Sequence, residues 1–575
     1  MNRLRPTCRV VRALLALLAL LALAPCAVPN GAAASSAATL SAGAVASPDR
    51  YGALAAREVL RAGGNAVDAA VATGFALAVT YPEAGNLGGG GFMTLYVNGH
   101  AYFLDYRETA PAKAGAAMYL DARGEPIANL SLVGNLSVGV PGTVRGMAEA
   151  HRRFGSLSWA RDLAPAIRYA HRGFLVTAQL IGIRDDSRAP FEGVTNFDRS
   201  FAAMQAGKLF RQPALARTLE RIAKGGDQEF YEGPTADLLV AQMAHGPTTG
   251  LITREDLARY RAVWREPVRE RWNSYEVITA PPPSSGGIAL LQLLRMKQDA
   301  APLFRGVVLN SPQYMHLTAE IEKRVFADRA EYLGDPDFVK VPVGELLSDE
   351  YLARRAAEID ASKPSPLAAI QPGLERGDRD KPQTTHYSIV DRWGNAVSNT
   401  YTLNGWFGAG VVVEGAGFLL NDEMDDFSVK PGVPNQYGVV GGDANAIAPY
   451  KRPLSSMTPT ILTENGRVAM VIGTPGGSRI FTSLFQVLAD VYDFGLALQP
   501  ALAQLRFHHQ LLPESTMFSE PYAPFDSALV DGLAQRGYRV EAQDFNGDIE
   551  AIQIIGNSPL AAADPRARGV AMIVR

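Results

Sequence analysis

Two threonines occupy matching positions in a predicted β-hairpin. The β-rich runs TTHYSIV (384–390) and NAVSNTYTL (395–403) flank the turn sequence DRWG, whose centre lies near Trp393. Symmetry about Trp393 pairs Thr384 with Thr402. Directly opposed residues of an antiparallel pair have Cβ atoms roughly 5 Å apart, so one hydroxyl could hydrogen-bond the other. A register slip of one residue would break this pairing, and opposed threonines also occur in purely structural sheets.

A glycine turn follows a later predicted strand. The strand VAMVIG leads into TPGGS (474–478), and apolar residues at helical spacing follow from Ile480 to Val491. Gly476 and Gly477 would then lie at a helix N-terminus, where unpaired backbone N–H groups suit an oxyanion. The alternative is a Gly-Gly connector without a catalytic role.

Groups that could bind an amino-acid-like substrate are spread along the chain. Arg107 ends the second strand of a hairpin predicted around Asn98-Gly99, where it could bind an anion or be a solvated charge. The run EMDDF (423–427) offers acids for an ammonium group, and LSSMTPTI contains a serine pair. With a hydroxyl nucleophile and an oxyanion turn, these groups suit acyl transfer.

Helices and a linker must position these groups. The sequence predicts a helix over 53–62 and a second, nearly uncharged helix capped by Asn65 with Asp68 at its third position, which we expect to be buried. Residues 110–360 are predicted to be mostly helical and to cover a sheet. PPPSSGG (281–287) is either a connector or a loop lining the site, and 360–383 is predicted to be an exposed linker.

Composition indicates a globular protein that acts on small molecules. The 575 residues include 55 Lys+Arg and 58 Asp+Glu, a formal charge of −3, and 47% are hydrophobic. These values exclude disordered and fibrous classes, and without a sustained basic block we expect no nucleic-acid partner.

The first 34 residues are predicted to be a cleaved signal peptide. Four arginines precede the apolar run of 12 residues from Ala13 to Ala24, which is too short for an anchor. Cys26 offers a lipoprotein alternative, which Pro25 disfavours. Signal removal takes away four arginines and both cysteines, which leaves a charge of −7 and excludes cysteine chemistry. We expect export across the cytoplasmic membrane, most plausibly to the periplasm, and no membrane anchor in the mature protein.

Histidine, metal and nucleotide chemistry are not expected. His386 invites a triad interpretation, but side-chain alternation along the strand argues against it, and no G-x-S-x-G elbow is present. His508 and His509 lack a third ligand at metal spacing. Neither a P-loop nor G-x-G-x-x-G occurs, so the sequence predicts neither a metal nor a cofactor.

Several motifs together resemble one family. GGNAVDAAVAT, LGGGGFM, DYRETAP, PPPSSGG, QTTHYS, NDEMDDFS, KRPLSSMTPT and GTPGGSR make residues 52–575 similar to the gamma-glutamyltranspeptidases, which are N-terminal-nucleophile hydrolases. The resemblance implies an α+β fold, a four-layer αββα sandwich. It further implies a precursor that cleaves itself between Gln383 and Thr384 into a large subunit (35–383) and a small subunit (384–575), which stay associated.

The same resemblance assigns roles to individual residues. It implies that Thr384 is the nucleophile and carries its own α-amino base, that Thr402 orients it, and that the Gly476 and Gly477 amides form the oxyanion hole. It implies a substrate-carboxylate clamp of Arg107, Ser455 and Ser456, ammonium partners Asn404, Glu423 and Asp426, and a lid over 431–453 with Tyr437.

The implied reaction is γ-glutamyl transfer and glutathione hydrolysis through a γ-glutamyl-enzyme, resolved by water or by an amino acid or peptide acceptor. Two alternatives remain open. One is an acylase of the same fold that removes a glutaryl-like group from a β-lactam, and the other is an uncleaved protein that only binds γ-glutamyl compounds.

Overall fold

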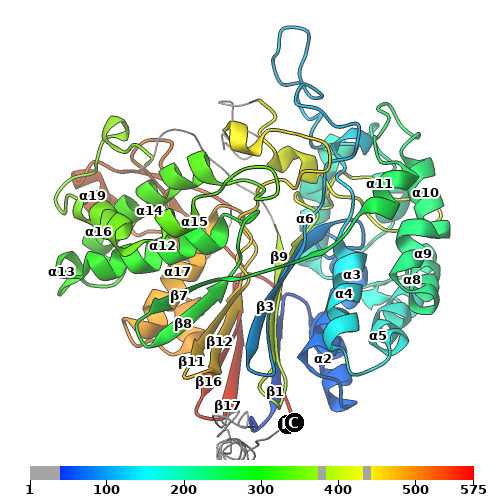
Figure 1. Cartoon of the computed structure of the whole chain (residues 1–575), viewed down its shortest axis with the longest axis horizontal. Coiled ribbons are helices and arrows are strands. Elements are labelled where there is room, and N and C mark those ends of the chain that lie inside the picture. Colours follow the sequence, from blue (N-terminus) through cyan, green and yellow to red (C-terminus); the bar gives the residue numbers. More distant parts are fainter. Residues whose placement is uncertain (1–38, 373–383, 431–441, 545) are drawn as a thin grey trace, which may run out of the picture. The chain divides into compact units, whose positions relative to one another are not determined.

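Two β-sheets pack face to face, and each is covered on its outer side by helices (Figure 1). The computed structural model describes residues 39–372, 384–430, 442–544 and 546–575, and Thr39–Arg575 forms one compact unit. The predicted signal peptide, Gln383 and Tyr437 lie outside the described residues. The predicted α+β class and the αββα layering are confirmed.

The first sheet has seven antiparallel strands in the order β18-β1-β9-β10-β2-β3-β6. Their bounds are β18 (Val570–Val574), β1 (Gly43–Ser47), β9 (Thr385–Val390), β10 (Ala396–Thr402), β2 (Gly90–Val97), β3 (His100–Tyr106) and β6 (Val263–Arg265). The Asn98-Gly99 turn joins β2 to β3 as predicted, with both residues at positive φ.

The second sheet has six antiparallel strands in the order β17-β16-β12-β11-β8-β7. Their bounds are β17 (Ser558–Ala563), β16 (Glu550–Ile555), β12 (Arg467–Gly473), β11 (Thr460–Glu464), β8 (Tyr275–Thr279) and β7 (Val268–Trp272). Both sheets therefore combine strands from before and after Thr384.

Helices from the first half of the chain cover the first sheet. They are α2 (Arg50–Arg61), α3 (Ala66–Thr80), α4 (Thr143–Phe154), α5 (Trp159–Arg172), α6 (Ala178–Arg188), α7 (Phe197–Phe201), α8 (Pro213–Gly225), α9 (Asp227–Glu232), α10 (Pro234–Gln242) and α11 (Arg254–Arg259). Asn65 and Asp68 form the capping box predicted for α3, and every residue of this helix is buried. The first helix begins earlier than predicted because Asp49 caps it.

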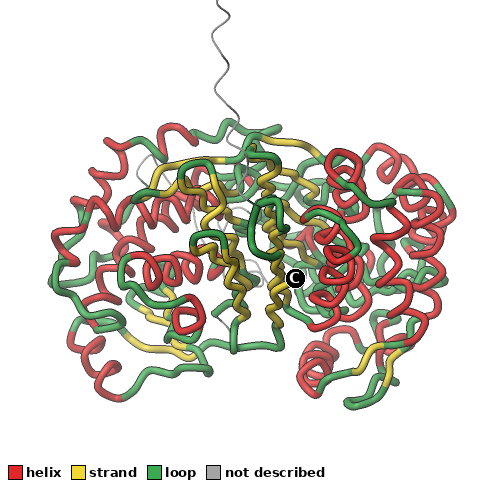
Figure 2. Tube along the Cα trace, turned by 90° about the horizontal axis from the view of Figure 1, so that it is seen from below, coloured by secondary structure: helices red, strands yellow, loops and turns green. Residues whose placement is uncertain are grey.

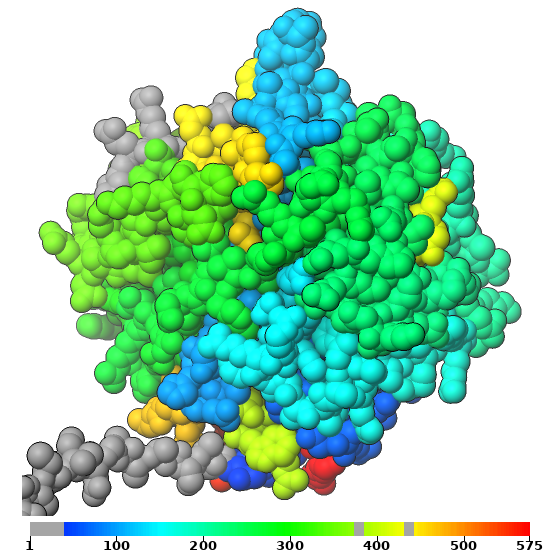
Figure 3. All heavy atoms as spheres, turned by 45° about the vertical axis from the view of Figure 1, so that its right-hand side comes forward, coloured from blue at the N-terminus to red at the C-terminus, as the bar shows by residue number. Residues whose placement is uncertain are grey.

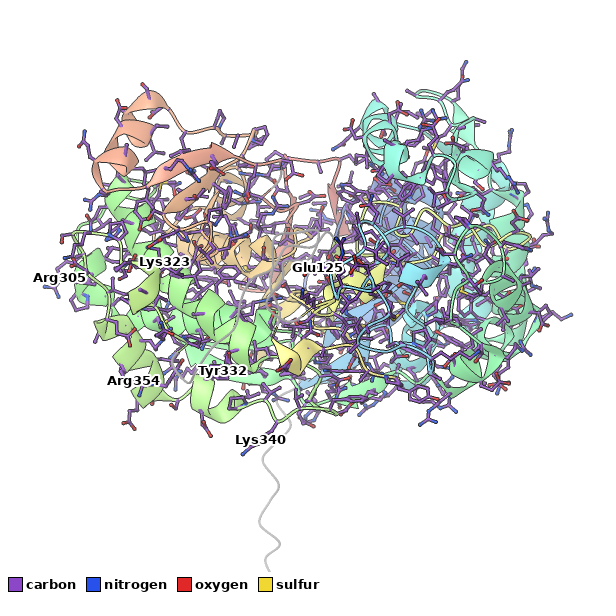
Figure 4. All side chains as sticks on the ribbon, turned by 90° about the horizontal axis from the view of Figure 1, so that it is seen from above. Glu125, Arg305, Lys323, Tyr332, Lys340 and Arg354 are labelled. Atoms are coloured by element: carbon purple, nitrogen blue, oxygen red, sulfur yellow. The ribbon has the colours of Figure 1, made fainter. Side chains whose placement is uncertain are left out.

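The second sheet is covered by a different set of helices (Figure 2). They are α12 (Gly286–Asp299), α13 (Ala301–Phe304), α14 (Pro312–Tyr332), α15 (Val343–Leu346), α16 (Asp349–Ala357), α17 (Arg479–Tyr492) and α18 (Leu498–Leu502). A further helix, α19 (Ser527–Gln535), packs against α14. Lys323 and Tyr332 of α14 mark this layer in Figure 4.

Small elements connect these layers. Two minor sheets consist of β13 (Phe507–His508), β14 (Thr516–Ser519) and β15 (Arg539–Ala542), and of β4 (Phe174–Leu175) and β5 (Leu209–Phe210). Short 3₁₀ helices are η1 (Asn135–Ser137), η2 (Ala189–Phe191), η3 (Leu367–Ala369), η4 (Glu423–Asp426) and η5 (Asp443–Asn445). The segment between β3 and η1 projects from the surface (Figure 3).

The apolar core follows the layers. One cluster lies between the first sheet and its helices, another between the second sheet and its helices, and a third, including Val390, Ile461 and Ile552, lies between the sheets. The stretch 110–360 is mostly helical as predicted, but 263–279 contains β6, β7 and β8. No helix in the described part of the chain is long and apolar enough to cross a membrane.

Candidate active site

The β9–β10 hairpin has the register predicted from symmetry about Trp393. Its Cα pairs run from Ala396 opposite Val390 to Tyr401 opposite Thr385. One further step places Thr384 opposite Thr402, and both residues are buried. Thr402 Oγ1 accepts the N–H of Asn404 at 2.7 Å. The hairpin therefore holds both threonines at its open end.

His386 is excluded as a base for a different reason than alternation along the strand. In a strand, residues 384 and 386 share a face, so the argument from alternation was wrong. Both ring nitrogens are instead engaged, Nδ1 with Thr400 Oγ1 at 2.8 Å and Nε2 with Ser388 Oγ at 3.0 Å. Burial lowers the pKa of His386 to about 3. The imidazole is thus a neutral core group.

The glycine turn follows β12, which packs across β9 and β10. Ser398 Oγ of β10 donates to Ile472 O at 3.0 Å, and a Cβ added at Gly473 would lie 2.2 Å from the His386 ring. Gly476 and Gly477 have φ of 128° and 65°. Their carbonyls accept the N–H groups of Arg479 and Ile480 at the start of α17. The turn therefore begins where β12 ends against the β9–β10 hairpin.

Arg107 is buried and is bound by acids. Its Nη1 donates to Glu423 and its Nη2 to Asp426, the two ends of η4. Nε and Nη2 also donate to Pro453 O at 3.3 Å and Leu454 O at 3.2 Å. Burial disfavours the cation, but Glu423 and Asp426 outweigh burial and raise the pKa of Arg107. Arg107 of the predicted carboxylate clamp thus contacts two of the predicted ammonium partners directly.

The serine pair is held by the PPPSSGG loop. Ser455 N donates to Pro283 O at 2.9 Å, and Ser455 O accepts Ser285 N and Ser285 Oγ, each at 2.7 Å. Ser456 Oγ accepts Arg329 Nη2 at 2.9 Å, and Arg329 Nε donates to Ser285 Oγ at 2.8 Å. Of the two interpretations of this loop, the structure supports the site-lining one.

Asn404 joins the hairpin to the acidic segment. It follows β10 with φ of 77°, and its Nδ2 donates to Asp422 O at 3.1 Å. Asp422 precedes η4, so Asn404 stands between Thr402 and the acids that bind Arg107. Such a position suits a group that contacts the ammonium of an amino acid bound near the nucleophile.

Sequence reasoning missed two ionisable residues of this region. Glu108 is fully buried, has a carboxylate oxygen 3.7 Å from Arg107 Nη1, and lacks a hydrogen-bond partner for either oxygen among the described residues. Burial raises its pKa to about 7. Arg329 lies on α14, and burial lowers its pKa to about 9. Glu108 directly follows Arg107 and could have been noticed, whereas no local signal links Arg329 to Ser456.

A family model described as gamma-glutamyltranspeptidase matches residues 52–574. The chain belongs to the gamma-glutamyltranspeptidase family. A glutathione hydrolase proenzyme of Pseudomonas aeruginosa is 60% identical, covering 95% of this chain and 97% of the relative, and one of Escherichia coli is 44% identical, covering 91% and 90%. An acylase ACY 1 proenzyme of a Pseudomonas species is 38% identical, covering 78% of this chain and 79% of the relative.

Solved structures agree with this placement in the gamma-glutamyltranspeptidase family. A cephalosporin acylase from Bacillus halodurans superposes with a TM-score of 0.79 at 28% identity, covering 93% of this chain and 96% of its own. A gamma-glutamyltranspeptidase from Pseudomonas nitroreducens complexed with L-DON gives a TM-score of 0.58 at 58% identity, covering 59% and 100%. Transpeptidases and acylases thus share this fold.

Proposed function

We propose that this chain is a γ-glutamyltransferase and glutathione hydrolase that uses Thr384 as its nucleophile. The observation that carries the proposal is the β9–β10 register, which sets Thr384 opposite Thr402 beside the strand that leads to Gly476 and Gly477. A nucleophile, an orienting hydroxyl and an oxyanion turn are the parts that acyl transfer requires.

The chemistry begins with a free amine. Cleavage of the Gln383–Thr384 bond would free an α-amino group with a reference pKa near 8, which can take the proton of the Thr384 hydroxyl. The hydroxyl oxygen attacks the γ-glutamyl carbonyl, and the Gly476 and Gly477 amides stabilise the resulting oxyanion. The leaving amine takes the proton, and water or an acceptor amine then resolves the acyl-enzyme by the reverse steps.

Substrate binding uses the cluster around Arg107. The guanidinium, with the hydroxyls of Ser455 and Ser456, would bind the α-carboxylate of the glutamyl group. Asn404, Glu423 and Asp426 would bind its α-ammonium. Because Glu423 and Asp426 contact Arg107 directly, a substrate carboxylate must displace part of this pairing, and the incoming ammonium compensates the acids.

Two subunits of one precursor follow from this mechanism. We place the large subunit at 35–383 and the small subunit at 384–575, with Tyr437 in a lid. Both sheets contain strands of both subunits, which supports lasting association after cleavage. The basic and apolar N-terminal run supports export, with the periplasm as destination.

The acylase alternative is disfavoured by the buried acids. A glutaryl group carries a carboxylate but no ammonium, so it would leave Glu423 and Asp426 without the second cation that a glutamyl group brings. A protein that only binds would not need the nucleophile or the oxyanion turn, and both are present in this sequence.

The decisive experiment combines a denaturing gel with N-terminal sequencing. Purified wild-type protein should give two fragments, and the smaller should begin Thr-Thr-His-Tyr. Thr384→Ala should stay uncut and inactive, whereas Thr385→Ala, altered one residue away, should still be cut. Turnover by Thr384→Ala would refute the nucleophile. Preference for a glutaryl-cephalosporin over γ-glutamyl-p-nitroanilide would instead favour the acylase.

A further inference from the structure

Three potential metal ligands converge in the helical layer behind the first sheet. Asp68 lies in the first turn of α3, His151 in the last turn of α4, and Asp162 in the first turn of α5. One ligand atom from each lies within 4.8 Å of the others, and His151 Nε2 is 3.5 Å from Asp162 Oδ2. The residues are far apart in sequence, so no short motif predicts this cluster.

Asp162 is the group that points to a ligand. Its side chain has 0% exposure, and neither carboxylate oxygen has a hydrogen-bond partner among the described residues. The ion pair found for it in the described part of the chain is with His151. A buried carboxylate in this setting needs a counter-charge, because burial without one costs several kcal/mol.

Asp68 supplies the second negative charge. Its oxygens accept the N–H groups of Asn65, Ser156 and Leu157 and the hydroxyl of Ser156, a set of donors that suits a carboxylate anion. Ser156 is exposed, so its hydroxyl can turn to solvent and free one lone pair of Asp68.

We propose that Asp68, His151 and Asp162 bind a divalent transition-metal cation, with Zn²⁺ as the best match. Imidazole nitrogen and carboxylate oxygen are ligands of Zn²⁺, and two carboxylates balance its charge. His151 Nε2 donates to the Leu157 carbonyl, so to bind a metal through Nε2 the ring would take the other tautomer, with its proton on Nδ1. The Leu157 carbonyl, 3.0 Å from Nε2, or a water would complete four-fold coordination. The partly exposed His151 ring gives an entry path.

The competing occupant is a proton. Without a cation, burial and the neighbouring Asp68 raise the pKa of Asp162 to about 8, so a shared proton could satisfy the two carboxyls instead. The two occupants differ in what they predict, since only a metal-binding cluster responds to added Zn²⁺.

The bound metal would act on stability, away from the chemistry. It would fasten α3 to α4 and α5, and α3 supports the catalytic hairpin, because Ala70 O and Gly74 O accept the hydroxyls of Tyr387 and Tyr401. The proposal does not depend on the assignment of the nucleophile.

The test uses full-length processed protein stripped of metal with a chelator. Addition of Zn²⁺ should raise the unfolding temperature of the wild type by roughly 2 °C or more. One Zn²⁺ per chain should be retained after desalting, and Co²⁺ should give the visible absorption bands of a four-coordinate site. Asp162→Asn and His151→Gln should lose all three responses.

His171→Gln is the matched control, because His171 forms an exposed pair with Glu220 at 2.7 Å and should keep the Zn²⁺ response. If Asp162→Asn does not fold, His151→Gln decides, since His151 is the least buried ligand. Absence of a Zn²⁺ response in the wild type, with higher stability of metal-free Asp162→Asn, would assign the cluster to a proton and overturn the proposal.

Discussion

Tyr401 of β10 lies directly opposite Thr385 of β9. This pair fixes the register one step short of the open end of the hairpin, and so it sets Thr402 against the residue that we assign as the nucleophile. Everything that the hairpin contributes to catalysis depends on this alignment.

Thr402→Val should lower kcat by roughly 10²-fold, because it removes the hydroxyl that we expect to orient Thr384 while keeping the β-branched shape. Thr402→Ser should restore most of the activity. Thr400→Val is the control on the same face of the same strand, since Thr400 bonds His386 and should affect stability without a comparable loss of kcat. Equal turnover of Thr402→Val and wild type would remove Thr402 from the mechanism.

Gly476→Ala should reduce kcat by roughly 10²-fold or more, because alanine does not adopt φ of 128° and the turn must change. Gly466→Ala tests the general cost of positive φ, since Gly466 has φ of 73° with open space around its Cβ position. It should lose about 1 kcal/mol of stability and retain kcat. Steady-state kinetics and denaturant unfolding of both variants check this contrast.

Arg107→Lys should raise KM for a γ-glutamyl donor by roughly tenfold or more, because an ammonium cannot reproduce the fork that contacts Glu423 and Asp426. Arg145→Lys is the control, since it alters a buried pair with Asp227 elsewhere in the fold. Steady-state kinetics with a γ-glutamyl donor, measured on variants that are folded and correctly cleaved, check this prediction. An unchanged KM would contradict the assignment of Arg107 to the clamp.

His386 should make the protein less stable in acid. The folded state keeps its pKa at about 3, against an ordinary value of 6.5, so between these values the unfolded state binds more protons. The contribution of His386 to the free energy of unfolding should therefore fall by about 1.4 kcal/mol per pH unit as the pH drops from the higher of these values to the lower. Full stabilisation is present above pH 6.5.

Denaturant unfolding at several pH values between 7.5 and 5 checks the effect of His386. His386→Gln should be less stable at neutral pH but should lose less stability in acid, whereas His171→Gln should follow the wild type. The pH profile of kcat/KM should keep its shape in His386→Gln. A profile that loses its acidic limb would revive His386 as a catalytic base.

Local patterns predicted local structure well. The capping box of Asn65 and Asp68, the turn at Asn98-Gly99 and the register about Trp393 each depend on residues close in sequence, and each was confirmed. Of the strands within 263–279, β6 pairs with the distant β3 and β8 with the distant β11, whereas β7 and β8 also pair with each other in a local hairpin that was missed. Because helices precede and follow this stretch, we expected it to be helical as well.

Convergence of charged side chains was the hardest feature to predict. Arg107 and Glu423 are 316 residues apart, and we expected them to bind different groups of the substrate, its α-carboxylate and its α-ammonium. Their direct contact depends on where β3 and η4 meet, which no pattern in either segment specifies. The choice between a connector and a site-lining loop for PPPSSGG likewise required the observed bonds between Ser285 and Ser455.

The sharing of both sheets by strands from the two sides of Thr384 has a consequence for refolding. Neither piece of a cleaved chain could complete a sheet alone, because β9 and β10 lie between β1 and β2, and β8 pairs with β11. After denaturation, the two pieces would have to collide before either could fold, so recovery of activity should be second order in protein concentration. The uncut Thr384→Ala chain should instead refold at a rate independent of dilution.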